Sequence, residues 1–548
     1  MSKNSMVWGL AAVLAACGDS GGATDSAAGS ESNSGSSSTG GATPTSSASG
    51  MTGDASDSDE DDGTASMSAS GTTTTTEPTS EPGTLSQTGE TSATSTGGPG
   101  ETGATSTGET GPGSGSDSTT GAADFCSPPE VAVEDVPLND ACDVELQMGT
   151  FTPVTEWKYG SSSFYGPPVA GQTIDTNMSG QLDAQDKPLV FIYENGGVTA
   201  LWGDGSGVAW QKAGAYGNFG GLGLGDLEGD GWNEIVTASN VSVCALDGRD
   251  GAQKWCSNLP AANVDSFGFN YPALGDMDGD GLVEVVIGSA IFDSAGQLIG
   301  AGAQGKGSAN QAYGALSVIV DLDADGVMEV VTGNAAYDLD GNTLWQNGTV
   351  DGMVAVADFD LDGKGEIVKT LGSLVAGLES DGTPAWGPLQ YAGNIGTPAI
   401  DDLDGDGTPE IVFGSQNELI AMEWGGMEVW TATISDLSGA AGPALFDFES
   451  DGYPEVLYAD EIAIRFFSGL DGSPKYTSME HGSGTALETP IVADVDGDGH
   501  VEIVLGHGNG NAQIGAVTTF GDADNSWPPG RKIWNQHSYN ITNVIDLV

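Results

Sequence analysis

An acidic string of fixed spacing occurs seven times between residues 226 and 502, and no other feature of this 548-residue sequence constrains its fold as much. The first copy reads Asp226-Leu-Glu228-Gly-Asp230-Gly-Trp-Asn-Glu234, with carboxylates at positions 1, 3, 5 and 9 and glycine at position 6. The copies begin at residues 226, 276, 321, 358, 402, 447 and 494, a repeat of roughly 45 residues. This periodicity indicates a chain built from repeated structural units.

The residue types in the string indicate a calcium loop. When the loop curls, the carboxylates at positions 1, 3 and 5 converge, the glycine at position 6 permits a sharp turn, and the carbonyl of position 7 points inward. The carboxylate at position 9 then completes an all-oxygen shell of the kind that Ca²⁺ prefers. A metal-free Asp-Gly turn is the alternative for any single copy, but it does not account for seven complete copies.

The predicted ligands are the acidic side chains at positions 1, 3, 5 and 9 and the backbone carbonyl at position 7. In chain order they are Asp226, Glu228, Asp230, Trp232, Glu234; Asp276, Asp278, Asp280, Leu282, Glu284; Asp321, Asp323, Asp325, Val327, Glu329; Asp358, Asp360, Asp362, Lys364, Glu366; Asp402, Asp404, Asp406, Thr408, Glu410; Asp447, Glu449, Asp451, Tyr453, Glu455; and Asp494, Asp496, Asp498, His500, Glu502. Lys364 and His500 fit this pattern because position 7 contributes only its backbone.

An eighth, degenerate loop precedes these copies. It carries Asp175, Asn177, Ser179, Asp183 and Asp186 at positions 1, 3, 5, 9 and 12, with glycine at position 6. This is the spacing of a 12-residue EF-hand-type loop that ends in a shorter Asp instead of Glu. We therefore expect about seven or eight Ca²⁺ ions, one in each loop.

Strand signals flank each loop. A short apolar stretch such as Pro398-Ala-Ile400 precedes it, and a β-branched run such as Ile411-Val-Phe413 follows it. Farther on comes a hairpin signal with an Asp-Gly turn, as at Asp340-Gly341. Each unit of about 46 residues thus supplies about four strands, which is the size of a propeller blade. The predicted fold is an all-β propeller over residues 166–535. It has seven or eight blades, depending on whether the terminal units share one blade, and an open β-solenoid is the alternative.

The acidic strings resemble those of the FG-GAP or VCBS repeat family, the propeller type of integrin α subunits and of many bacterial surface proteins. The resemblance covers most of residues 166–535 and implies calcium bound between two strands of each blade. The FG-GAP motif itself is present only in part. Its first half is kept at Phe219-Gly220 and Phe267-Gly268, and its second half is resembled by Gly396-Thr-Pro398, Ala441-Gly-Pro443 and Thr489-Pro490. Residues 531–543 are similar to a closing segment of some bacterial members, and we interpret Trp534 and His537 within it as packing residues.

The first 165 residues have a different composition. Residues 1–17 resemble a bacterial lipoprotein signal peptide that ends in the lipobox Leu14-Ala-Ala-Cys17, so Cys17 is the predicted acylation site. An ordinary secretory signal is the alternative. Residues 18–125 are rich in Ser, Thr, Gly and acidic residues and predict a disordered linker, with an ion-collecting or glycosylated stalk as the alternative. Residues 126–165 form an N-terminal segment with a possible disulfide, and residues 536–548 form a C-terminal tail.

Cysteines and tryptophans add two structural expectations. Four cysteines remain after Cys17, and an even number in a chain expected to be exported favours disulfides. They are Cys126, Cys142, Cys244 and Cys256, and pairing 126 with 142 and 244 with 256 is the simplest of three connectivities. One tryptophan recurs near the end of most units, which favours packing between blades over stacking on sugars. These residues are Trp202, Trp210, Trp255, Trp345, Trp386 and Trp430.

Charge limits the function. The chain carries 13 Lys and Arg against 78 Asp and Glu, a net charge of −65, which excludes nucleic-acid binding through a basic patch. We expect a monomeric, non-catalytic, calcium-binding surface module for adhesion, anchored by its lipid to the outer membrane and binding a glycan or a protein; the inner membrane is the alternative location. The alternative functions are a calcium-dependent polysaccharide lyase and a quinone-dependent dehydrogenase. Both need cationic or proton-shuttling groups in a central pocket, and such groups are scarce here.

Overall fold

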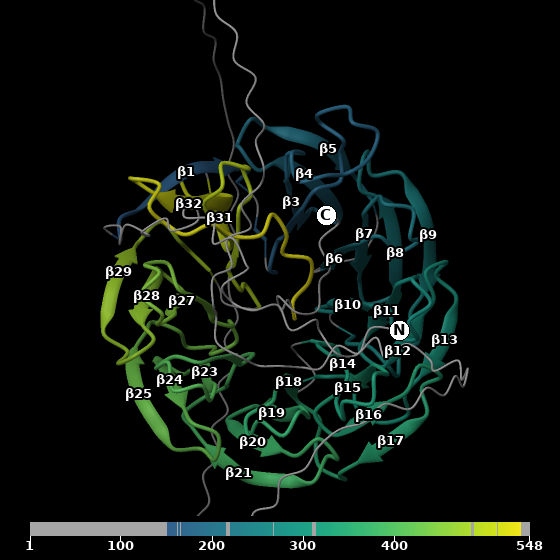
Figure 1. Cartoon of the computed structure of the whole chain (residues 1–548), viewed down its shortest axis with the longest axis vertical. Helices are drawn as coiled ribbons and strands as arrows, with labels where there is room; N and C mark the ends of the chain where they lie inside the picture. Colours follow the sequence, from purple (N-terminus) through teal and green to yellow (C-terminus); the bar gives the residue numbers. More distant parts are fainter. Residues whose placement is uncertain are drawn as a thin grey trace, which may run out of the picture. The chain divides into compact units, whose positions relative to one another are not determined.

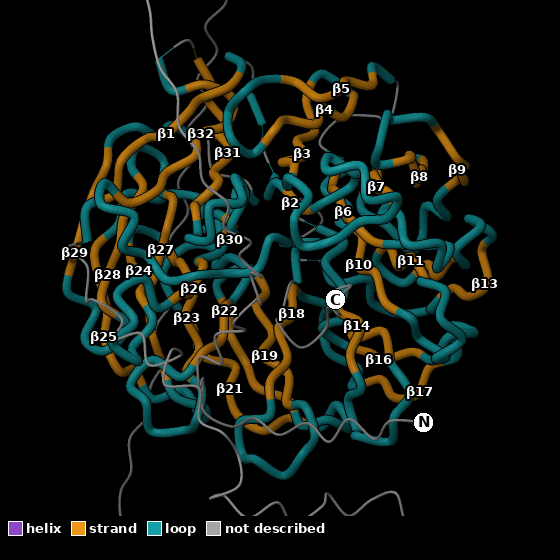
Figure 2. Tube along the Cα trace, turned by 45° about the horizontal axis from the view of Figure 1, so that its top comes forward, coloured by secondary structure: helices purple, strands orange, loops and turns teal. Residues whose placement is uncertain are grey.

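The computed structural model describes residues 151–538 except 162, 165, 215–219, 267, 309–313, 484–486 and 512. The described chain consists of β-strands joined by turns and loops, and the strands form a ring of sheets (Figures 1 and 2). No helix in this part has the length and apolar character needed to cross a membrane. The predicted signal peptide, the linker, Cys17, Cys126 and Cys142 lie outside the described residues.

Thirty-two strands form eight antiparallel four-stranded sheets, here called blades 1 to 8. Blade 1 contains β2 (Val169–Gly171), β3 (Leu189–Glu194), β4 (Gly197–Trp202) and β5 (Val208–Lys212), and blade 2 contains β6 (Gly221–Gly225), β7 (Glu234–Ala238), β8 (Ser242–Asp247) and β9 (Gln253–Asn258). Blade 3 contains β10 (Pro272–Gly275), β11 (Glu284–Ile287), β12 (Ala290–Phe292) and β13 (Leu298–Ala301), and blade 4 contains β14 (Val318–Val320), β15 (Glu329–Val331), β16 (Ala335–Tyr337) and β17 (Thr343–Gln346). Blade 5 contains β18 (Met353–Ala357), β19 (Glu366–Leu371), β20 (Leu374–Leu378) and β21 (Pro384–Gln390), and blade 6 contains β22 (Ala399–Asp401), β23 (Glu410–Ser415), β24 (Glu418–Met422) and β25 (Glu428–Thr433). Blade 7 contains β26 (Ala444–Phe446), β27 (Glu455–Ala459), β28 (Ile464–Ser468) and β29 (Pro474–Ser478), and blade 8 contains β30 (Ile491–Ala493), β31 (Glu502–Asn511), β32 (Gly515–Asp522) and β1 (Pro153–Tyr159).

The predicted all-β propeller is confirmed, and it has eight blades. Both ends of the ring contribute to blade 8, because β1 pairs antiparallel with β32 from Pro153 opposite Asp522 to Tyr159 opposite Val517. The ring thus begins before residue 166, where we expected it to start. Strand β1 lies in the segment 126–165 that we had set apart from the propeller. This pairing gives the edge of β32 a partner, which an open ring would lack.

The strands of a blade differ in burial according to their place in the ring. The fourth strands, such as β5, β9 and β13, run along the rim in Figure 1. Every residue of β7 and β11 is buried, whereas β9 at the rim has only exposed and half-buried residues. The second and third strands read as continuous apolar runs because neighbouring blades cover both of their faces.

The meander topology sorts the connections between two faces of the ring. In an antiparallel sheet, the connection from first to second strand and the connection from third to fourth strand lie at the same end. We call this end the loop face. The eight acidic loops all join a first strand to a second strand, so they all lie on the loop face.

Tryptophans of several fourth strands connect one blade to the next. The indole of Trp210 in blade 1 donates a hydrogen bond to the Gly248 carbonyl of blade 2, with a nitrogen-to-oxygen distance of 2.9 Å. Trp430 in blade 6 donates likewise to Gly469 of blade 7 at 2.5 Å. Gly472 has φ +68°, and a Cβ at this glycine would come within 2.5 Å of the Trp430 ring. These contacts confirm the packing role expected for both tryptophans.

Two further packing predictions are confirmed. Cys244 and Cys256 form a disulfide between β8 and β9. The C-terminal segment adds to the inner strands, since Ala170 and Trp534 exchange two backbone hydrogen bonds of 2.9 Å. The ring nitrogens of His537 lie 3.2 Å from the carbonyl oxygens of Pro272 and Ser317. The segment thereby links blades 1, 3 and 4.

Candidate metal centres

Each acidic loop is held by hydrogen bonds from its own backbone. In blade 6 the Asp402 carboxylate accepts the amides of Asp406 and Gly407 at 3.1 and 2.9 Å, and Asp406 accepts the amide of Thr408 at 2.8 Å. Gly407 has φ +92°, which permits the sharp turn. The aspartate at position 5 accepts the amide of position 7 in all seven strings. The backbone thus orients the carboxylates at positions 1 and 5.

The glutamate at position 9 closes every one of the seven loops. Its Oε2 accepts the amide of position 2, for example from Leu403 to Glu410 at 2.7 Å. The same contact occurs in the other six strings. The residue at position 2 is always apolar and at most 3% exposed, so it anchors the loop in the core. Position 2 was not among the residues predicted for the loop, although an apolar residue recurs there in all seven strings.

Burial sets the protonation of these glutamates. Each is at most 7% exposed. Burial, reinforced by the neighbouring carboxylates, raises the pKa of Glu284, Glu329 and Glu366 to about 7. Burial likewise raises the pKa of Glu410 to about 8 and that of Glu502 to about 9. The folded loops therefore favour the neutral acid at these positions unless a cation compensates the charge.

The blade 6 loop has a buried oxygen without a partner. Glu410 is 1% exposed, and its Oε1 makes no hydrogen bond. The carboxylates of Asp402, Asp404 and Asp406 place one oxygen each within 4.8 Å of one another. In addition to burial, the charges of Asp404, Glu423 and Asp402 raise the pKa of Glu410. Buried polar atoms normally have partners. The donor set, all carboxylate oxygens, fits a hard divalent cation such as Ca²⁺.

Other blades gather their carboxylates in the same way. Oxygens of positions 1, 3 and 9 come within 4.8 Å in blade 3 and in blade 5, and those of positions 1, 3 and 5 do so in blade 4. The residues are Asp276, Asp278 and Glu284; Asp358, Asp360 and Glu366; and Asp321, Asp323 and Asp325.

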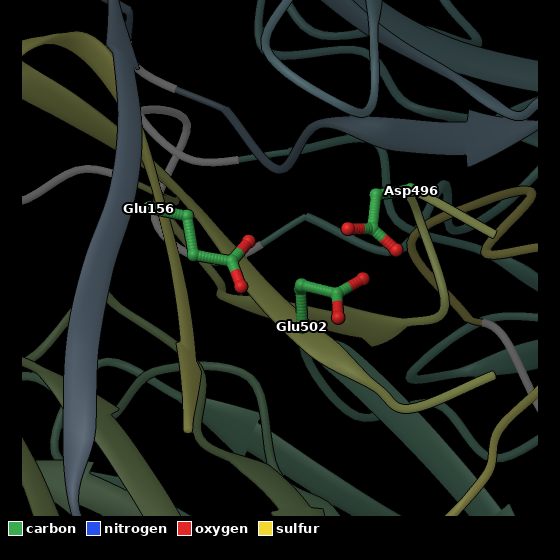
Figure 3. A group of neighbouring side chains, drawn as sticks. All are labelled: Glu156, Asp496 and Glu502. Atoms are coloured by element: carbon green, nitrogen blue, oxygen red, sulfur yellow. The ribbon is translucent and has the colours of Figure 1, made fainter. Parts of the chain in front are cut away.

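Blade 8 adds a carboxylate that sequence reasoning did not predict. Glu156 on β1 points toward Asp496 and Glu502, as Figure 3 shows, and one oxygen of each lies within 4.8 Å of the others. Burial and the charges of Asp496 and Asp498 raise the pKa of Glu156 to about 7. Both ends of the described ring thus contribute to this cluster.

In blades 2 and 7 a lysine of the fourth strand contacts the carboxylates of the loop. Lys254 Nζ lies 2.5 Å from Glu234 Oε1 and 3.1 Å from Glu228 Oε2. Lys475 contacts Glu449 and Glu455 in the same manner. Burial lowers the pKa of Lys254, but its hydrogen bonds to Glu234 and Glu228 outweigh this and leave the pKa raised, so the amine is charged at neutral pH.

The degenerate loop of blade 1 uses a different residue to close. Asp186 is fully buried, and its carboxylate accepts the amides of Thr176 at 2.7 Å and Asp183 at 2.9 Å. Thr176 is position 2 of this loop, so Asp186 takes the part that the position 9 glutamate takes elsewhere. Asp183 instead accepts a hydrogen bond from the Asn177 side chain at 2.9 Å.

Metal binding by the eight loops stays a prediction.

The comparisons with known proteins agree with the fold. Residues 402–458, which contain the blade 6 loop, match the FG-GAP-like repeat family. The resemblance to FG-GAP repeats is thus confirmed in this segment. No curated protein matches the sequence.

Several solved structures of other proteins have a similar fold. The biofilm matrix protein Bap1 of V. cholerae superposes with a TM-score of 0.58 at 18% identity, over 72% of this chain and 95% of Bap1. The rhamnogalacturonan lyase YesW has a TM-score of 0.47 at 16% identity, over 71% of this chain and 77% of YesW. BamB from Moraxella catarrhalis has a TM-score of 0.40 at 17% identity, over 66% of this chain and 98% of BamB. At these identities the likeness concerns the fold alone.

Proposed function

We propose that this FG-GAP-repeat propeller is a calcium-binding surface module that binds a glycan or a protein without catalysing a reaction. The buried Oε1 of Glu410, which lacks a hydrogen-bond partner beside an acidic loop, carries the proposal. Leaving a buried polar atom unpaired costs about 1–3 kcal/mol, and more when the group is charged. A cation bound in the loop removes this cost, and the carboxylates at positions 1, 3, 5 and 9 are the side chains that would hold it.

Calcium would supply positive charge and oxygen coordination at each loop. The chain's own residues do the rest, because the position 2 side chain and the backbone amides hold the loop in its folded shape. The four carboxylates of one string repel one another at short range in the absence of a cation. Cation binding to the folded state therefore stabilises the ring by mass action.

The distribution of basic side chains supports a non-catalytic role. His481 and His507 are buried with their Nδ1 atoms 2.9 Å apart, and burial lowers the pKa of His481 to about 4 and of His507 to about 3. Six of the Lys and Arg side chains in the described ring already pair with carboxylates. They are Lys158, Lys187, Arg249, Lys254, Arg465 and Lys475.

The proposal places the module at the cell surface, held to the outer membrane through a lipid on Cys17. The lipobox before Cys17 and the long linker after it support this placement. The fold neighbour Bap1, a biofilm matrix protein, is consistent with it. The proposed module acts as a monomer.

Thermal unfolding tests the calcium part. We expect the melting temperature of the full chain to fall in a chelator and to recover when Ca²⁺ is added back. The variant D402N should reduce the calcium-induced rise, whereas D381N, which changes an Asp-Gly turn outside the acidic strings, should leave it unchanged. Equal melting temperatures with calcium and after rigorous chelation would refute calcium binding.

An array of bacterial, algal and plant polysaccharides tests the ligand part. The full chain is applied with Ca²⁺ and with a chelator, and the products of any retained glycan are analysed. Calcium-dependent retention of an intact glycan supports a glycan-binding module. Shortened or unsaturated products would contradict the non-catalytic role, and an empty array from folded protein would leave a protein as the partner.

A further inference from the structure

One position in the fourth strand of each blade interrupts the pairing with the third strand, and in blades 2, 7 and 8 the side chain there reaches the acidic loop. The pairing of third and fourth strands skips one residue of the fourth strand near the loop face in all eight blades. A residue skipped in this way forms a β-bulge, which redirects its side chain. From blade 1 to blade 8 the skipped residues are Ala209, Lys254, Ile299, Leu344, Ala385, Val429, Lys475 and Glu156.

The two lysines at this position occur together with a second change. Glu228 and Glu449 are the only glutamates at position 3 of the seven strings, and they belong to the two blades with a lysine at the bulge. Glutamate is one methylene longer than aspartate and reaches the ammonium group. Lys254 lies 3.1 Å from Glu228, and Lys475 contacts Glu449.

Blade 6 shows the same loop without a lysine. Its bulge residue is Val429, its position 3 residue is Asp404, and Glu410 Oε1 is buried without a partner. In blade 2 the equivalent oxygen, Glu234 Oε1, receives the ammonium of Lys254 at 2.5 Å. The lysine thus contacts the glutamate oxygen that lacks a partner in blade 6.

We propose that Lys254 and Lys475 take the place of the calcium ion in blades 2 and 7. The inference rests on the proposed function and restricts its calcium ions to the loops without a lysine at the bulge position. Lys254 and Lys475 are only 19% and 23% exposed, and each ammonium engages the carboxylates of positions 3 and 9. A calcium ion in the same loop would face this positive charge and would have to draw both carboxylates away from it. Two of the eight blades therefore hold their loops without metal.

Counting bound calcium tests the proposal. The full chain is dialysed to equilibrium against buffered Ca²⁺, and the ions per chain are measured by atomic emission. We expect the double variant K254M/K475M to bind two more ions than the wild type. The control K212M removes a positive charge from the outer strand β5, where Lys212 pairs with no carboxylate among the described residues, and we expect it to bind as many ions as the wild type.

The reverse change gives a second test that does not depend on the folding of the lysine variants. D404E/V429K introduces the glutamate and lysine pair into blade 6, and we expect it to bind one ion fewer than the wild type. The lysine proposal is overturned if wild type and K254M/K475M bind the same non-zero number of ions, or if D404E/V429K loses none. Absence of bound calcium in every protein would instead refute the proposed function, and the inference would fall with it.

Discussion

Replacing Glu410 with glutamine should change the stability of the ring in opposite directions with and without calcium. Glu410 is 1% exposed, and burial raises its pKa from 4.5 to about 8. Between pH 4.5 and about pH 8, the Glu410 carboxyl is therefore protonated in the metal-free folded protein and ionised in the unfolded chain. Its stability falls as pH rises through this window. The shift corresponds to a loss on the order of 4 kcal/mol across the window.

The variant E410Q cannot titrate at this residue, so it should escape that loss. Relative to wild type, metal-free E410Q should gain stability on the order of 4 kcal/mol between pH 5 and pH 8. For a cooperative unit of nearly 400 residues this is roughly 4–5 °C in melting temperature. Calcium should reverse the order at high excess, since an ion at about 10,000 times its dissociation constant adds about 5.5 kcal/mol that E410Q loses with its ligand.

The assay is thermal unfolding of both proteins at pH 5, 6, 7 and 8, first in chelator and then with Ca²⁺. The control E418Q removes an exposed glutamate from the same blade and should follow the wild type under both conditions. Because the other six position 9 glutamates titrate in both proteins, the difference between them reports on Glu410 together with its neighbour Glu423. An identical pH dependence of wild type and E410Q in chelator would refute the reasoning.

Two further predictions concern packing. W430A removes a side chain that is 8% exposed, together with its hydrogen bond to Gly469. Urea unfolding should show that the free energy of unfolding falls by about 3–5 kcal/mol, and by less for W430F. A loss below about 1 kcal/mol would contradict the packing role. C244S/C256S opens a link between residues 12 apart and should lower the free energy of unfolding by roughly 3 kcal/mol, and a reducing agent should lower the stability of wild type but not of the variant.

Repetition made the fold predictable. Each acidic string specifies a turn between two strands, and strings such as those beginning at Asp276 and Asp402 recur at the spacing of a four-stranded blade. Local chemistry is enough here, because the four carboxylates of one string lie within nine residues. The pairing of Cys244 with Cys256 was predictable for the same reason, since a short hairpin brings the two together.

Contacts between distant segments were not predictable in this way. Glu156 reaches Asp496 and Glu502 only because ring closure places β1 beside β32, and nothing near Glu156 in the sequence marks it as a loop residue. The number of blades also depends on ring closure, because β1 from one end and β30 to β32 from the other form a single blade.

The part of the loops that depends on neighbouring strands also required the structure. Lys254 is twenty residues from Glu234, and only the bulge in β9 turns its side chain toward the loop. In blade 1 the sequence pattern favoured Asp183 at position 9, but the fold buries Asp186 against the amide of Thr176 instead. The sequence by itself determined the repeat, the turn of each loop and the acidic side chains in it, because these follow from residues close together in the chain. Tertiary structure alone decided the number of blades and which further charges enter each loop, because both depend on strand pairing between residues far apart in sequence.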